Sequence, residues 1–117
     1  MRDTLKPGIE HELKFRVPET KTVPHLYPEA PEFQAMPRVF ATGYLVGFLE
    51  WACIQAVNPH LEWPREQTVG THVDVSHAAA TPPGLEIVAR GTHERFVIDA
   101  ARFTDKAHRK SLADRAK

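Results

Sequence analysis

Glu50 is the residue whose position in this sequence most strongly suggests chemistry. It is the only charged residue in a segment of sixteen residues, GYLVGFLEWACIQAVN, that is otherwise almost wholly apolar. A carboxylate in such a segment is costly to bury unless it is paired or takes part in a reaction. Two interpretations remain open: Glu50 is a catalytic carboxylate, or it is exposed where the segment lacks cover.

Thr42 and His77 are the other candidates for catalysis. Thr42 precedes the apolar segment, where a threonine commonly caps a helix and where the helix N-terminus stabilises a developing oxyanion. His77 ends an alternating apolar row just before a turn, and an imidazole there suits acid–base work near pH 7. Each residue also has a purely structural interpretation, as a helix cap and as a structural histidine. Eight helical residues from Thr42 to Glu50 span about 12 Å, so either Thr42 lies in a loop that folds back or, as we expect, the site combines two copies of the chain.

Gly70, Arg95 and Cys53 each have a chemical and a structural interpretation. Gly70 would let a substrate approach the backbone closely, or would relieve a strand bulge. Arg95 would bind an anionic group of a substrate, or would pair on the surface with Glu94 or Asp99. Cys53 lies midway along the apolar segment and is expected in the core rather than as a nucleophile, because burial raises the pKa of a thiol.

The pattern of apolar residues predicts one central helix and several strands. Alternation favours strands at 9–17 and 68–77, and one long strand or two short ones over 85–100, broken near Gly91. The apolar segment, residues 43–58, has helix length, and apolar residues on nearly all sides predict that it is wrapped by protein.

Two segments are unlike regular elements. Five prolines in residues 18–38 exclude a continuous helix or a central strand there. Because this stretch is also apolar, it predicts an ordered flap with short helices. The tail is densely charged, and this charge predicts a frayed helix or disorder from about residue 104.

The composition predicts a single globular domain over residues 1–117, with 42% hydrophobic and 26% charged residues. Fifteen basic residues balance fifteen acidic ones, so no net field would recruit nucleic acid or a membrane surface. With no signal peptide and no apolar run of the ~20 residues that a membrane span requires, we expect a cytoplasmic protein. No histidine pair has metal-binding spacing and only one cysteine is present, so no metal and no cofactor is expected.

Seven separated segments resemble the fluoroacetyl-CoA thioesterases. They are His25-Leu-Tyr-Pro-Glu, Val39-Phe-Ala-Thr-Gly, Glu50-Trp-Ala-Cys, Gly70-Thr, His77, Ala80-Thr-Pro-Pro-Gly and Gly91-Thr-His-Glu-Arg. The resemblance implies an α+β hotdog fold, an antiparallel sheet wrapped around one long helix, working as a homodimer. It also implies site residues: Thr42 as the reactive threonine, Glu50 as the acidic residue, His77 as the histidine, Gly70 beside the acyl pocket and Arg95 in the last strand.

The chain departs from this family in two places. Only residues 85–90 stand where the family has a β-hairpin, so we expect about three strands rather than the usual five, with the last strand able to pair with the first. The helix would then be less covered, which favours association. In the flap, Phe33 and Phe40 are kept but Met36 replaces an expected aromatic residue. Methionine is more pliable, which bears on fluoroacetyl preference rather than on thioester hydrolysis.

The sequence therefore predicts hydrolysis of a small acyl-CoA thioester to the free acid and coenzyme A. Thr42 and Glu50 would position and activate the attacking group, His77 would transfer protons, and Gly70 with the helix N-terminus would polarise the carbonyl. Coenzyme A is part of the substrate rather than a cofactor. Two alternatives remain: a non-catalytic acyl-CoA binder or inactive hotdog remnant, and a structural dimerisation module.

Overall fold

The computed structural model describes residues 1–6, 8–77, 80–87 and 92–115. A long central helix, α2, separates a short N-terminal strand and a proline-rich flap from the remaining strands and a C-terminal helix. In chain order the elements are β1 (Phe15–Arg16), η1 (Glu19–Lys21), η2 (Val23–His25), α1 (Pro31–Gln34), α2 (Thr42–Val57), η3 (Asn58–His60), β2 (Glu66–Asp74), β3 (Glu86–Ile87), β4 (Thr92–Asp99) and α3 (Ala100–Arg115).

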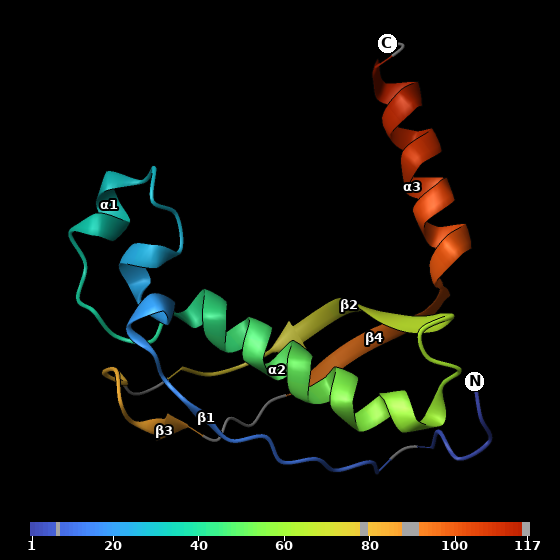
Figure 1. The fold of residues 1–117 in the computed structure, drawn as a ribbon, viewed down its shortest axis with the longest axis horizontal. Coiled ribbons are helices and arrows are strands. Elements are labelled where there is room, and N and C mark those ends of the chain that lie inside the picture. The colour runs from blue at the N-terminus through green and yellow to red at the C-terminus, as the bar shows by residue number, and fades with distance from the viewer. Residues whose placement is uncertain (7, 78–79, 88–91, 116–117) are drawn as a thin grey trace.

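The four described strands form two antiparallel pairs, with α2 running alongside both (Figure 1). β1 pairs with β3, and β2 pairs with β4 from Glu66 opposite Asp99 to Asp74 opposite Thr92. The α+β class and the central helix are as predicted. The expected pairing of the last strand with the first is wrong, because β4 pairs with β2 instead.

The core lies at the amino-terminal half of α2. Val17, Phe40, Leu45 and Phe48 form its buried cluster, and side chains from β1 and β3 pack against them. Farther along the same helix Trp51 is 47% exposed. An apolar helix that is only partly covered is what the shortened sheet led us to expect.

The strand predictions are right in place and wrong in extent. Of the predicted strand at 9–17 only Phe15–Arg16 is a strand, because its partner β3 is itself two residues long. The prediction at 68–77 corresponds to Glu66–Asp74. The segment 85–100 contains two strands, the second of the two alternatives predicted for it, so the described residues form four strands where about three were expected. The expected break near Gly91 lies outside the described residues.

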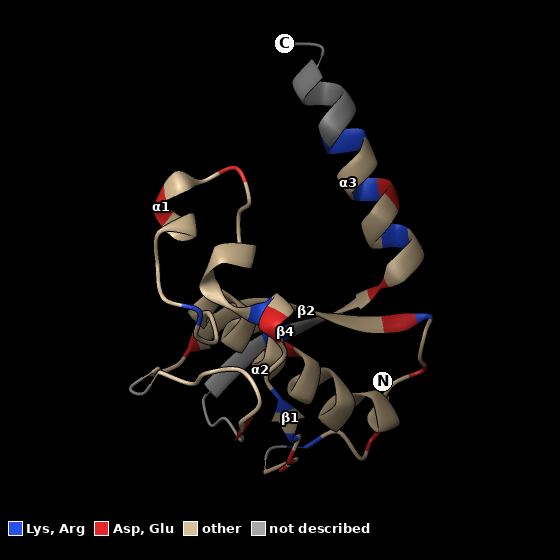
Figure 2. Ribbon diagram, turned by 60° about the vertical axis from the view of Figure 1, so that its left-hand side comes forward, with Lys and Arg blue, Asp and Glu red and all other residues tan. Residues whose placement is uncertain are grey.

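The flap is ordered as predicted, and the tail forms a helix, one of the two alternatives predicted for it. The flap contains η1, η2 and α1, and an isolated bridge between Thr22 and Phe40 ties it to the residue pair before α2. α3 extends away from the strands (Figure 1), and Figure 2 shows mostly blue positions along its described part, with red at one place. Its described side chains from Ala101 to Lys110 are exposed. Among the described helices, none has the length and apolar character needed to cross a bilayer.

Candidate active site

Thr42 and His77 meet at the N-terminus of the central helix. The hydroxyl oxygen Oγ1 of Thr42 lies 2.7 Å from Nδ1 of His77, within hydrogen-bond distance. The prediction that Thr42 caps α2 is wrong. Thr42 is the first residue of the helix, Ala41 holds the cap position, and no side chain makes a capping hydrogen bond. The hydroxyl is instead engaged with the imidazole, in the arrangement that a nucleophile or water-positioning group needs with a base.

Packing around Phe40 brings these two residues together across 35 positions of sequence. The Phe40 backbone N–H donates to the carbonyl of Thr81 at 2.7 Å, which joins the segment beyond His77 to the chain just before α2. The Phe40 ring is 2% exposed and meets the His77 ring edge-on at 6.5 Å between centroids. One buried aromatic residue therefore orients the imidazole toward the helix N-terminus.

The flap covers the same end of the helix. The Tyr44 hydroxyl donates to the carbonyl of His25 at 3.0 Å. A Cβ atom at Gly43 would lie 2.9 Å from Cδ2 of Leu26, so a glycine is what allows this close approach. The first intrahelical bond runs from Leu45 N–H to Ala41 at 2.9 Å, so the N–H groups of the three preceding residues point out of the helix end. They form a local positive pole beside the Thr42 hydroxyl.

Glu50 and Arg95 form a second group, farther along α2. Nη1 of Arg95 lies 3.6 Å from Oε1 of Glu50. The Arg95 side chain is 9% exposed, whereas that of Glu50 is 44% exposed. The expectation of a surface pair for Arg95 is wrong in this respect: the guanidinium is buried against the central helix. Gly70 stands opposite Arg95 in the β2–β4 register, and the pairing shifts between Gly70 and His72, which agrees with the structural interpretation of Gly70.

Cys53, one turn after Glu50, belongs to this second group. Burial is the largest influence and raises the pKa of the Cys53 thiol above its usual value. The nearby Arg95 guanidinium acts in the opposite direction, and the Glu50 carboxylate adds to the increase. A thiol held protonated in this way is a poor nucleophile, in agreement with the expected core role.

The predicted site residues thus fall into two groups, in keeping with the separation expected of Thr42 and Glu50. Thr42, His77 and Phe40 lie at the start of α2. Glu50 lies about 12 Å farther along the helix axis, with Arg95 beside it and Gly70 opposite Arg95 in the strand register. The two remaining candidates belong to the flap. They lie away from the helix, where Phe33 stacks on Tyr27 with 5.9 Å between ring centroids and Met36 is 47% exposed.

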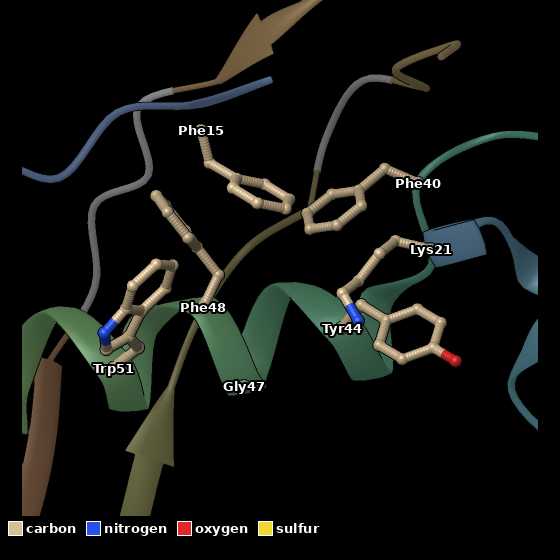
Figure 3. Close-up of a pocket in the computed structure, with 7 residues that line it drawn as sticks. All are labelled: Phe15, Lys21, Phe40, Tyr44, Gly47, Phe48 and Trp51. Carbon is tan, nitrogen blue, oxygen red and sulfur yellow. The ribbon is translucent and has the colours of Figure 1, made fainter. Parts of the chain in front are cut away.

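An apolar hollow of about 250 Å³ lies beside α2, between the helix and the aromatic side chains of Phe15 and Phe40 (Figure 3). Phe40 connects the hollow to the Thr42–His77 pair, because its ring lines the hollow and also contacts the His77 ring. Lys21 supplies the single charge, and its Nζ lies 4.9 Å from the centre of the Tyr44 ring. The lining residues are Phe15, Lys21, Phe40, Tyr44, Gly47, Phe48 and Trp51.

Sequence reasoning missed two contributors to these groups. Gly43 was treated as part of the helix, although its missing side chain makes room for Leu26. Thr68 was read only as a strand residue, yet it accepts two hydrogen bonds from Arg95. Neither has a signature in the sequence, because both depend on which residue lies opposite in space. Within the described part of the chain no cluster of three or more His, Cys, Asp or Glu residues could hold a metal ion.

Comparison with known proteins places this arrangement in a family. The fluoroacetyl-CoA-specific thioesterase family, FlK, matches residues 17–90, well over half of the chain. The chain belongs to this family. The fluoroacetyl-CoA thioesterase of Streptantibioticus cattleyicolor is 41% identical over 139 aligned positions, which cover 97% of this chain and 99% of that protein. Because 139 positions exceed the 117 residues present, the relative has segments that this chain lacks.

Solved structures of FlK agree closely with the fold. A variant of FlK matches with a TM-score of 0.86 at 41% identity, covering 93% of this chain and 99% of that chain. A FlK variant in complex with fluoroacetate and CoA matches with a TM-score of 0.80 at 42% identity, covering 86% and 98%. A Thermus thermophilus protein of the thioesterase superfamily matches with a TM-score of 0.73 at 17% identity, covering 96% and 100%, and that likeness concerns the fold alone.

Proposed function

We propose that this protein hydrolyses a small acyl-CoA thioester of the fluoroacetyl-CoA type to the free acid and coenzyme A. The observation that carries the proposal is the contact between Thr42 Oγ1 and His77 Nδ1 at the N-terminus of α2. Membership of the FlK family supports it, as does the complex of a FlK variant with fluoroacetate and CoA. A hydroxyl, a base and a helix N-terminus together are the parts that acyl transfer requires.

The geometry suggests how each part acts. The attacking group is the Thr42 oxygen or a water molecule that Thr42 orients. As this group bonds to the thioester carbonyl carbon, His77 accepts its proton. The helix N-terminus stabilises the oxyanion that forms. When the carbon–sulfur bond breaks, His77 returns the proton to the coenzyme A sulfur. If Thr42 carries the acyl group, water then releases the acid by the same proton route.

Glu50 enters this scheme through a second copy of the chain. Within one copy it is about 12 Å along the helix from Thr42, and its side chain remains 44% exposed. We infer that the working site combines the Thr42–His77 pair of one protomer with Glu50 of the other. A carboxylate brought to the imidazole in this way would orient it and stabilise its protonated form.

The exposed surface supports a homodimer. The chain exposes 8544 Å², against about 6400 Å² for a compact monomer of 13.2 kDa. Its radius of gyration is 17.3 Å, against about 13 Å for a compact domain of this length. An excess of about 2000 Å² is in the range that one partner contributes to a large, stable interface. Large apolar side chains, Trp51, Trp63 and Phe103 among them, are about half exposed.

Three further features complete the proposal. The reaction uses protein groups and water, with coenzyme A as part of the substrate and no metal or redox cofactor. It takes place in the cytoplasm. The partners are the acyl-CoA substrate and a second copy of the chain, since balanced charge gives nucleic acid or a membrane surface no general attraction.

Thiol release from acetyl-, propionyl- and fluoroacetyl-CoA tests the function directly. We expect turnover by the wild type and a loss of at least about 100-fold in His77→Ala, the range for removal of a general base. The substrate ranking measures whether Met36 relaxes fluorine preference. No turnover by a folded, dimeric wild type would reject the enzyme. Calorimetry with acyl-CoA would then distinguish a binder from a dimerisation module.

A further inference from the structure

Thr68 of β2 accepts two hydrogen bonds from the guanidinium of Arg95. We propose that Thr68 is a positioning residue, which fixes Arg95 so that one of its nitrogens faces the Glu50 carboxylate. The effect of Thr68 on turnover rests on the proposed function, whereas its hold on Arg95 stands on the geometry alone.

The two anchoring bonds are short and use different groups of Thr68. Nε of Arg95 donates to the hydroxyl oxygen Oγ1 at 2.7 Å, and Nη2 donates to the backbone carbonyl oxygen at 2.7 Å. The third nitrogen, Nη1, lies 3.6 Å from Oε1 of Glu50. Because the guanidinium is planar and rigid, fixing Nε and Nη2 also fixes the direction in which Nη1 points.

The strand register explains why this residue can reach Arg95. Thr68 lies opposite Val97, and Gly70 lies opposite Arg95. Thr68 and Arg95 are therefore diagonal neighbours across the β2–β4 pair, a spacing that a long side chain spans. The pairing shifts only after Gly70, so the anchor lies in the regular part of the ladder.

Burial differs sharply between the two charged partners. The Arg95 side chain is 9% exposed, and a buried cation must have its donors paired. Glu50 is 44% exposed, so its carboxylate faces accessible space while one oxygen is held near Nη1. At 3.6 Å the ion pair is longer than a direct hydrogen bond, which leaves carboxylate lone pairs for a reacting group. Arg95 therefore orients the Glu50 carboxylate and leaves it able to interact with a reacting group.

Two substitutions of Thr68 distinguish a positioning role of its hydroxyl from a role in packing alone. Thr68→Val keeps the branched shape and the backbone carbonyl but removes the acceptor for Nε, whereas Thr68→Ser keeps the acceptor. We expect Thr68→Val to lower kcat about tenfold, the lower range for a hydrogen bond to a charged group, with KM changed less than about twofold. Thr68→Ser should restore most of kcat. Thr104→Val, an equivalent change on the exposed face of α3, serves as the control.

A double-mutant cycle tests whether Thr68 acts through Arg95. In an Arg95→Gln background, Thr68→Val should cause no further loss of kcat, because the anchored group is gone. Equal losses in both backgrounds would overturn the proposal, as would a kcat for Thr68→Val equal to that of Thr104→Val. If Thr68→Val does not fold, Thr68→Ala supplies the same test.

Side-chain NMR of the arginine Nε–Hε groups tests the anchor without any turnover. The Arg95 signal, assigned by its loss in Arg95→Gln, should exchange slowly with water in the wild type and in Thr68→Ser. It should exchange at least about tenfold faster in Thr68→Val. Slow exchange in Thr68→Val would overturn the proposal. Absence of turnover with this exchange pattern intact would reject the proposed function and leave the anchor standing.

Discussion

Thr42 and His77 lie 2.7 Å apart, from hydroxyl oxygen to imidazole nitrogen, although 35 positions separate them in the chain. The hydroxyl is at the start of α2, yet it does not cap the helix. A threonine cap would stabilise the helix by about 1 kcal/mol. The helix forgoes that stabilisation, and the hydroxyl is directed at a base instead. A hydroxyl within hydrogen-bond distance of an imidazole is the arrangement of a nucleophile and its base.

The Thr42 hydroxyl should be required for turnover and nearly irrelevant to stability. Thr42→Val keeps the shape of the side chain and removes its oxygen. We expect kcat/KM for acetyl-CoA to fall by at least about 100-fold, with the melting temperature close to that of the wild type. Thr42→Ser, which keeps the oxygen, should retain activity within about tenfold. Comparable rates for the valine and serine variants would contradict a role for the hydroxyl.

Mixing two inactive variants tests whether the site spans two protomers. Thr42→Val and Glu50→Gln should each be inactive alone. After an equal mixture is refolded, half of the dimers contain one copy of each variant. If Thr42 of one copy works with Glu50 of the other, each mixed dimer has one intact site. Activity should then recover to about a quarter of the wild-type value. Recovery that stays at the background of either variant would place Thr42 and Glu50 in the same copy.

The sequence predicted the central helix to within one residue at each end, 43–58 against Thr42–Val57. It did so because an apolar run of helix length between Thr42 and Pro59 leaves few alternatives. It also predicted alternating burial near β1, where Lys14 and Arg16 are exposed and Val17 is buried. Both features are set by local pattern.

Contacts between distant segments could not be predicted in the same way. Nothing local indicates that β4 pairs with β2, or that Arg95 faces Glu50 instead of the surface. Strand pairing depends on which edges remain free once the sheet is shortened, and that is a property of the whole chain. Helix geometry alone separates Thr42 from Glu50, whereas the partners of each, His77 and Arg95, depend on long-range contacts that no local pattern indicates.

Two glycines of α2 should respond differently to the same substitution. A Cβ atom at Gly43 would lie 2.9 Å from Cδ2 of Leu26, whereas one at Gly47 would meet nothing within 4 Å. Gly47→Ala should therefore raise the free energy of unfolding by up to about 1 kcal/mol through helix propensity. Gly43→Ala should show less of this gain, because Leu26 must move, and should raise KM for the acyl-CoA by shifting the flap. Denaturant unfolding and steady-state kinetics measure both effects. Equal stabilisation with unchanged KM would rule out a tight contact between the flap and the helix.

The alkylation of Cys53 reports on the charges of Glu50 and Arg95. Burial raises the pKa of the Cys53 thiol, Arg95 lowers it, and Glu50 raises it. Because only the thiolate reacts, the rate of modification by iodoacetamide should have its midpoint above the pH typical of a free thiol. Arg95→Gln removes a cation that favours the thiolate, so the midpoint should move to higher pH. Glu50→Gln removes an anion that disfavours the thiolate, so the midpoint should move to lower pH. Mass spectrometry over a pH series measures both shifts, and shifts of the same sign in the two variants would contradict the placement of Cys53 between these charges.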